Sequence, residues 1–288
     1  MARLVYTSDL HGILDLYRAA GEAAVRTCAD ALIFGGDLCP GSPMGASQRL
    51  PIEHVEFILQ RLSPLLGEWK QAHPALRIFA IPGNDDCQTV LPALEELERN
   101  ARIENLHQQT RILGAYTLMG LSFVPPTPFL LKDFERWDDG PDPDSDSYSY
   151  RCLTGTTRGF RVIENFRSYL DSLPSIEQEL RRLPVEDPAH TVAVVHAPPF
   201  DTRCDVLFDG RHIGSKAVRS WIEKNQPYFS LHGHIHESPK LSRSFFDRIG
   251  STTVINPGCD HARPHLVFID LDNPAELEHS LYGKKAVR

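Results

Sequence analysis

Five short apolar runs in the sequence each end in residues that can donate oxygen or nitrogen to a metal ion. The runs cover residues 3–7, 31–35, 76–81, 191–195 and 228–231. Each run is bounded by turn-forming residues, which predicts a short buried β-strand rather than a helix. Helical patterns at 13–28 and 52–65 separate the first three runs, so the first part of the chain predicts a βαβαβ arrangement.

The residues that follow these predicted strands are carboxylates, an amide and imidazoles. They are Asp9 and His11 after the first strand, Asp37 after the second, Asn84, Asp85 and Asp86 after the third, His196 after the fourth, and His234 and His236 after the fifth. In α/β sheets, the loops that carry functional groups converge at the carboxyl ends of the strands. Such donors suit divalent cations such as Mn²⁺, Fe²⁺, Zn²⁺ or Co²⁺. The pattern therefore predicts a metal site at that edge.

The composition is that of an ordinary globular protein and excludes several classes of function. Hydrophobic residues make up 41% of the chain, charged residues make up 24%, and the formal net charge is -8. An acidic chain lacks the basic surface that binds nucleic acid non-specifically. No stretch approaches the ~18 apolar residues of a membrane-spanning helix, and no secretory signal precedes the first strand. The six cysteines form no CxxC pair, so we expect a cytoplasmic enzyme with reduced thiols and no membrane partner.

The remainder of the chain predicts further strands, two helices and one long loop. Strands are predicted near 101–104, 110–113, 115–119, 120–124, 241–247, 252–256 and 264–271, and helices at 160–183 and 215–225. Residues 125–159 are rich in Pro, Asp, Ser, Tyr and Gly, which predicts a long functional loop. The aromatic residues that run through it are Phe129, Phe134, Trp137, Tyr148 and Tyr150. We therefore expect a single domain over residues 1–288, with this loop as a lid insertion.

The ordered motifs resemble those of the calcineurin-like metallophosphoesterases. They are Asp9-Leu10-His11, Gly35-Gly36-Asp37, Gly83-Asn84, His196 and Gly233-His234-Ile235-His236, with an Asn256-Pro257-Gly258 turn near the end. The resemblance implies an α/β fold, a four-layer α-β-β-α sandwich of two mixed β-sheets flanked by helices.

The same resemblance implies a dinuclear metal centre that hydrolyses a phosphate ester by a metal-bound hydroxide. Mn²⁺ is the expected metal, with Fe, Zn, Co or Ni as alternatives. The implied ligands are Asp9, His11 and His236 for one ion and Asn84, His196 and His234 for the other, with Asp37 as the bridge.

One departure from the family pattern concerns the position after Asn84. Most members carry His there, with an implied role in stabilising the transition state or protonating the leaving group, but this chain carries Asp85. Bacterial and archaeal members with a non-His residue followed by Asp resemble this stretch better, and they tend toward phosphodiesters. We therefore expect a phosphodiesterase with Asp85 and His196 as catalytic residues. The histidines that could replace the missing acid are His107, His212, His261 and His265. The alternatives are a phosphomonoesterase, including a protein phosphatase, or a non-catalytic scaffold on this fold.

The expected substrate is a small-molecule phosphate ester that contacts Asn84 and Arg203. Arg203 and Arg211 could instead be solvated surface residues. Asp85 either orients a ligand histidine or forms the turn. Asp86 is expected to be structural, as the cap of the helix that follows it. The sequence predicts neither the natural substrate nor the oligomeric state.

Overall fold

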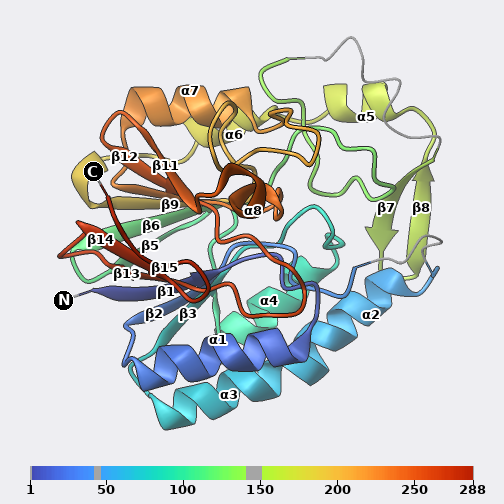
Figure 1. Cartoon of the computed structure of the whole chain (residues 1–288). Coiled ribbons are helices and arrows are strands. Elements are labelled where there is room, and N and C mark those ends of the chain that lie inside the picture. Colours follow the sequence, from blue (N-terminus) through green and yellow to red (C-terminus); the bar gives the residue numbers. More distant parts are fainter. Residues whose placement is uncertain (1, 42–46, 141–150, 288) are drawn as a thin grey trace.

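Two β-sheets packed face to face form the centre of the computed structural model, which describes residues 2–41, 47–140 and 151–287 (Figure 1). The larger sheet contains, from edge to edge, β15 (Gly283–Ala286), β14 (Glu276–His279), β13 (Val267–Asp270), β1 (Arg3–Thr7), β2 (Ala31–Phe34), β3 (Arg77–Ala80) and β4 (Glu104–Asn105). The smaller sheet contains β11 (Phe246–Ile249), β12 (Thr252–Ile255), β10 (Phe229–Leu231), β9 (Thr191–Val195), β6 (Tyr116–Leu121) and β5 (Thr110–Leu113).

The central strands of both sheets are parallel. In the larger sheet β1 to β4 are parallel neighbours, and in the smaller sheet β12, β10, β9 and β6 are parallel neighbours. Parallel neighbours end at the same edge of a sheet. The loops after β1, β2 and β3 therefore lie together, and so do the loops after β9, β10 and β12.

Helices cover the outer faces of the two sheets. One group comprises α1 (Leu14–Arg26), α2 (Leu50–Glu56), the π-helical segment η1 (Phe57–Leu62), α3 (Ser63–Ala72) and α4 (Val90–Arg99). The other group comprises α6 (Ile176–Arg181) and α7 (Lys216–Asn225). Three shorter elements are α5 (Phe166–Asp171), η3 (Pro188–His190) and α8 (Ser238–Ser242). Figure 1 shows α1 and α3 on the opposite side of the sheets from α6 and α7.

Strands that are apolar on both faces explain why the layers stack. In β1, Val5 packs against the helices of the first group, whereas Leu4 and Tyr6 face the smaller sheet. Val194 and Leu231 belong to the same buried cluster between the sheets. A third cluster joins the smaller sheet to α6 and α7. Three apolar interfaces separate four layers, which confirms the α-β-β-α sandwich of two mixed sheets flanked by helices.

The helix predicted over residues 160–183 is wrong. This stretch begins with β8 (Gly159–Ile163), which pairs with β7 (Cys152–Thr156) in a separate two-stranded sheet, and continues as α5 and α6. Side chains of Asn165 and Ser175 cap the two short helices, and Ser175 forms a capping box with Gln178. These caps and Pro174 divide the stretch, so it does not form one continuous helix.

Two other predictions of secondary structure need correction. The strands predicted at 115–119 and 120–124 form the single strand β6, because Gly120 lies inside the strand against the carbonyl of Leu106 and is not a turn. The strand predicted at 241–247 begins only at Phe246, after the short helix α8. Tyr148 and Tyr150 of the long loop lie outside the described residues. In the described part of the chain, no helix has the length and apolarity needed to cross a membrane.

Candidate metal centre

The seven side chains predicted as ligands converge where the parallel strands of both sheets end. The shortest distances are 3.7 Å from His11 Nε2 to Asp37 Oδ2, 3.5 Å from His196 Nε2 to Asp37 Oδ2, and 3.2 Å from His196 Nε2 to Asn84 Oδ1. The ring of His234 lies 5.5 Å from that of His196, and the ring of His236 lies 6.1 Å from that of His11. Loops from both sheets therefore contribute to one cluster.

Asp37 occupies the middle of this cluster. Its Oδ2 faces one imidazole from β1's loop and one from β9's loop, His11 and His196. Burial alone would raise the pKa of Asp37, but the two imidazoles and the backbone N–H of Asp85 hold it well below its usual range. An ionised carboxylate between two sets of donors has the position that a bridging ligand requires.

Asp9 and His196 each have a donor atom placed to bind a metal ion. Asp9 Oδ1 accepts the backbone N–H of His234 at 2.9 Å, but the buried Oδ2 has no hydrogen-bond partner among the residues that the structure describes. An unpaired buried carboxylate oxygen is unfavourable, so it fits a cation in its free direction. His196 Nδ1 lies 2.8 Å from the carbonyl of Gly35, so Nε2, which faces the other predicted ligands Asn84 and Asp37, is the ring nitrogen that could bind a metal.

The pKa of His196 is raised by the negative charges around it. Burial lowers the pKa of this imidazole, but the charge and hydrogen bond of Asp37, the charge of Asp9 and the hydrogen bond to the carbonyl of Gly35 together outweigh burial and raise it to about 9. A cation of higher charge placed there would displace this proton, as metal binding to histidine does in general.

Four of the seven predicted ligands have a left-handed backbone. Their φ angles are 60° for Asp9, 43° for His11, 50° for Asp37 and 65° for His234. Residues other than glycine adopt positive φ rarely, and such strain gathers at functional sites. Close packing leaves little freedom here, because a Cβ on Gly36 would lie 2.2 Å from His196 Nδ1.

Asp85 and Asp86 have different environments although they are neighbours. The Asp85 carboxylate is partly exposed and lies 3.6 Å from His11 Nδ1, on the side of the ring opposite the contact with Asp37. Burial, together with the charge of Asp37, raises the pKa of Asp85 to about 7. This position is that of a group that orients His11.

The predicted role of Asp86 as a helix cap is wrong. Its buried carboxylate accepts the backbone N–H groups of Leu38, Cys39 and Gly83 at 2.8–2.9 Å. Asp86 therefore joins the loop after β2 to the loop after β3, which are the loops that carry Asp37 and Asn84. Helix α4 begins at Val90 without a side-chain cap.

A buried group of Cys39, His54 and Asp86 also has metal-ligand geometry and was missed by sequence reasoning. Both ring nitrogens of His54 are already engaged, one with the carbonyl of Pro40 at 3.0 Å and the other with the N–H of Cys87 at 3.1 Å. The group therefore has a structural role beneath the ligand loops.

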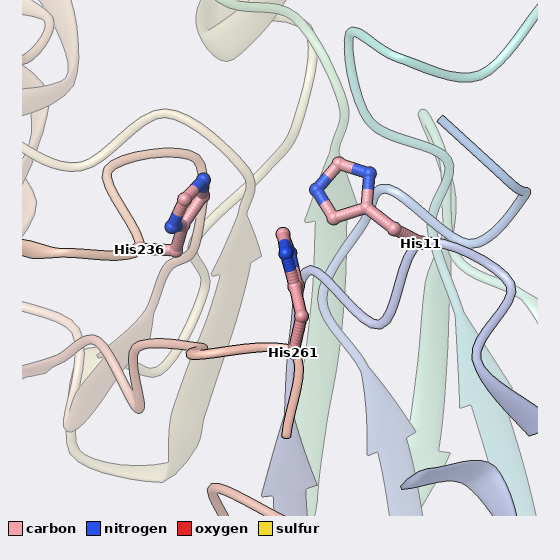
Figure 2. A group of neighbouring side chains, drawn as sticks. All are labelled: His11, His236 and His261. Carbon is pink, nitrogen blue, oxygen red and sulfur yellow. The ribbon is translucent and has the colours of Figure 1, made fainter. Parts of the chain in front are cut away.

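Only one of the four proposed substitute acids lies against the ligand rings. His261 is 4.9 Å from His11 and 5.3 Å from His236 between ring centroids (Figure 2). His107 and His265 are buried in hydrogen bonds to the backbone, and His212 pairs with Asp205 at 2.7 Å.

Arg203 and Arg211 lie in different surroundings. Arg203 is exposed, and its backbone N–H binds the Asp247 carboxylate at 2.9 Å. Arg211 instead lines a cavity of about 850 Å³ that is also lined by His234 and His236. The structure thus brings Arg211, and not the predicted Arg203, to the cavity beside the predicted ligands His234 and His236.

Comparison with known proteins identifies the family. A family model described as calcineurin-like phosphoesterase matches residues 2–238. The chain belongs to the calcineurin-like phosphoesterase family. Calcineurin-like phosphoesterases use divalent metal ions, so this chain is a metal-dependent hydrolase of phosphoric esters, and its histidine and carboxylate groups supply candidate ligands.

Solved structures share the fold of this calcineurin-like phosphoesterase at low sequence identity. One crystal structure has a TM-score of 0.62 at 16% identity, covering 98% of this chain and 99% of the other. The protein TT1561 of Thermus thermophilus has a TM-score of 0.54 at 18% identity, covering 100% and 99%. A dimetal phosphatase from Danio rerio has a TM-score of 0.53 at 11% identity, covering 100% and 97%. No curated protein matches the sequence.

Proposed function

We propose that this protein hydrolyses phosphodiesters at a dinuclear metal centre. The observation that carries the proposal is the position of Asp37, whose Oδ2 lies within 3.7 Å of His11 and 3.5 Å of His196. One ion would be held by Asp9, His11 and His236, the other by Asn84, His196 and His234, with Asp37 between them. A similar fold in a dimetal phosphatase supports two ions rather than one.

When bound, two divalent ions supply positive charge that offsets the charge of the phosphate, and they lower the pKa of a water molecule. Donors that are imidazoles, carboxylates and an amide oxygen favour Mn²⁺, with Fe, Zn, Co or Ni as alternatives. The task of the chain is to orient these donors. Gly35 fixes the ring of His196, and the N–H of His234 fixes Asp9.

Charge at Asp85 supports a diester over a monoester. A monoester has a second pKa of about 6 and carries nearly two negative charges at neutral pH, whereas a diester carries one. The Asp85 carboxylate follows Asn84 directly and lies within 3.6 Å of His11. The pKa of Asp85 is raised to about 7, so the carboxyl is partly ionised at neutral pH, and its ionised form repels a dianion more strongly than a monoanion. A good leaving group also needs less help from an acid, and this chain lacks the histidine that most family members carry at that position.

The cavity beside His234 and His236 supports a small-molecule substrate. Its volume of about 850 Å³ lies in the range of ligand pockets, roughly 300–1,000 Å³. The second candidate function is a phosphomonoesterase, including a protein phosphatase, which the dimetal phosphatase with a similar fold favours.

The test measures bound metal and compares two chromogenic substrates. Purified protein is analysed for metal content and assayed with Mn²⁺ on bis-p-nitrophenyl phosphate and on p-nitrophenyl phosphate. We expect about two ions per chain and faster turnover of the diester. Asp37→Ala should abolish both metal retention and turnover, whereas the exposed Asp15→Ala on α1 is the matched control. Absence of metal and turnover with every metal tried would refute the proposal, and faster monoester turnover would refute the diester preference.

A second experiment tests Asp85 itself. Asp85→His restores the residue type that most family members carry, so it should raise turnover of esters with poor leaving groups more than that of p-nitrophenyl esters. If Asp85→His and the unaltered protein hydrolysed every ester at the same rate, Asp85 would not occupy the acid position.

A further inference from the structure

A cavity lies beside the candidate metal centre, and most of its wall is apolar. It is formed by residues 125–129, by parts of the loop 207–213 and by the turn 234–237. Because His234 and His236 belong to its wall, a phosphate held at the centre would direct one of its substituents into this space.

Exposed apolar side chains gather in this cavity. Phe208 is 78% exposed, Phe129 is 53% exposed and Ile213 is 36% exposed, and all three line it. Among the described residues only seven large hydrophobic side chains are this exposed, so three of the seven share one cavity. Clustered exposed apolar surface marks a binding site, because its contact with water is unfavourable.

A buried ion pair holds one wall of the cavity in place. Lys132 and Glu135 are fully buried and lie 3.0 Å apart, and Lys132 Nζ also donates to the carbonyl of Thr127 at 2.7 Å. The hydroxyl of Thr127 donates to Glu135 and accepts the N–H of Phe129. The backbone of Phe129 is therefore held by these buried residues, although its ring is exposed.

The charges that line the cavity do not favour a negatively charged group on the ligand. Arg211 Nε binds Asp209 at 2.7 Å, and the Glu237 carboxylate lies 3.9 Å from His236. The described lining residues therefore offer an anionic substituent no unpaired positive charge. The complement of this surface is a neutral, flat or branched apolar group.

We propose that this cavity binds the non-reacting substituent of the substrate and selects an aromatic or other apolar ester group. This inference rests on the proposed function, which supplies the phosphate next to His234 and His236. Phe208 and Phe129 are the specificity-determining residues, and Lys132 and Glu135 position Phe129.

The test compares two diesters that share the p-nitrophenyl leaving group and differ in the other substituent, phenyl or methyl. Phe208→Ala and Phe129→Ala should each raise KM for the phenyl diester on the order of 10-fold and leave kcat and the methyl diester nearly unchanged. The matched control is Ile112→Ala, which removes another exposed side chain, on β5 and outside the cavity. Equal changes for both diesters, or none, would overturn the proposal.

A binding experiment separates this proposal from the proposed function. Calorimetry with phenyl phosphate and methyl phosphate on the Mn²⁺-loaded protein requires no turnover. Tighter binding of phenyl phosphate that is lost in Phe208→Ala supports the subsite even if no diester is hydrolysed. Equal affinity for the two ligands in the unaltered protein would overturn the subsite even if diesters are hydrolysed.

An independent observation concerns a third imidazole at the ligand cluster. β12 is parallel to β10, so its carboxyl end lies at the same edge as the ligand loops. The loop after β12 carries His261, and nitrogens of His11, His236 and His261 all lie within 4.8 Å of one another. Figure 2 shows the His261 side chain between the other two rings.

The loop that carries His261 is fastened to the ligand loop after β10. Cys259 N–H donates to the carbonyl of His236 at 3.0 Å. Asn256 Nδ2 donates to the carbonyls of Gly233 and Ile235 at 3.2 and 3.0 Å. His261 also has a left-handed backbone with φ 58°, like four of the predicted ligands. Its position is therefore built into the fold and is not an accident of an exposed side chain.

We infer that His261 is a further ligand of the ion held by Asp9, His11 and His236. The test is calorimetric and spectroscopic titration of metal-free protein with Co²⁺. His261→Ala should weaken one of the two binding events at least 10-fold and change the visible absorption of that Co²⁺ ion, because its donor set changes. The control is the exposed His190→Ala in η3, which should leave both unchanged.

Each outcome of this titration has one interpretation. An unchanged affinity and spectrum in His261→Ala would overturn the inference while the dinuclear centre stands. Failure of the unaltered protein to bind Co²⁺ would overturn both. A loss of stability is checked by thermal unfolding of the metal-free variant, and the exposed side chain predicts an unchanged midpoint.

Discussion

Asp86 offers a direct test of how the ligand loops are held together. Its Oδ2 accepts the N–H groups of Leu38 and Gly83 at 2.9 and 2.8 Å, and its Oδ1 accepts that of Cys39 at 2.8 Å. Asp86→Asn keeps the shape of the side chain but has only one oxygen. If this oxygen retains two of the bonds, the amide group faces the third N–H, and no acceptor replaces the lost one.

The loss in free energy of unfolding expected for Asp86→Asn follows from these three hydrogen bonds. A hydrogen bond to a charged group contributes about 1.5–3 kcal/mol and a neutral one about 0.5–1.5 kcal/mol. Losing one charged bond and converting two to neutral bonds therefore lowers the free energy of unfolding by about 3.5–6 kcal/mol. The N–H of Cys39 is left unpaired, because Cys39 is fully buried.

Urea unfolding of metal-free protein, followed by circular dichroism, measures this loss. Asp85→Asn is the matched control, because the same chemical change at the partly exposed neighbour removes no comparable set of bonds. Asp86→Asn should also weaken metal binding, since it loosens the loops that carry Asp37 and Asn84. An unfolding free energy within about 1 kcal/mol of the unaltered protein would refute the reasoning.

Three further predictions concern stability and the shape of the site. Burial, followed by the charge of Arg136, lowers the pKa of His107 to about 3. The contribution of His107 to the free energy of unfolding is fully present above its unfolded pKa of about 6.5 and falls by about 2 kcal/mol on going to pH 5. Urea unfolding at each pH should show a weaker pH dependence in His107→Gln. Lys132→Met should cost about 3–5 kcal/mol by leaving Glu135 unpaired, and the double variant with Glu135→Leu should recover most of it in the same assay. In Gly83→Ala the new Cβ would lie 2.2 Å from Asp37 Oδ1, so we expect loss of bound metal by elemental analysis, while Gly140→Ala, which meets no described atom within 4 Å, should retain it.

The sequence predicted the parallel strands and their ligand loops because both signals are local. β1, β2 and β9 are buried on both faces, so each reads as an unbroken apolar run. The donors follow within a few residues, where no tertiary information is needed. The sandwich itself was implied by the family resemblance and is confirmed by the two sheets and their covering helices.

Other parts of the structure left no such local signal. β15 is an edge strand that is exposed along its whole length, and every second residue of its neighbour β14 is exposed, so the unbroken apolar pattern is missing. His261 lies outside every motif, because its approach to His11 depends on β12 being the parallel neighbour of β10. The role of Asp86 likewise depends on two loops that are far apart in the sequence.

The ligand loops are held in place by contacts that do not involve a metal. Left-handed backbone at Asp9, Asp37 and His234 is unfavourable in isolation and persists only where surrounding structure fixes it. Asp86 supplies part of that structure through backbone hydrogen bonds, and the hydroxyl of Tyr6 supplies more by donating to the carbonyl of His232 at 2.7 Å. These hydrogen bonds hold the predicted donors in place, and among the described residues the buried Oδ2 of Asp9 has no hydrogen-bond partner. A cluster held in this way would lose little conformational entropy on binding a cation, so more of the metal–ligand free energy would be expressed as affinity.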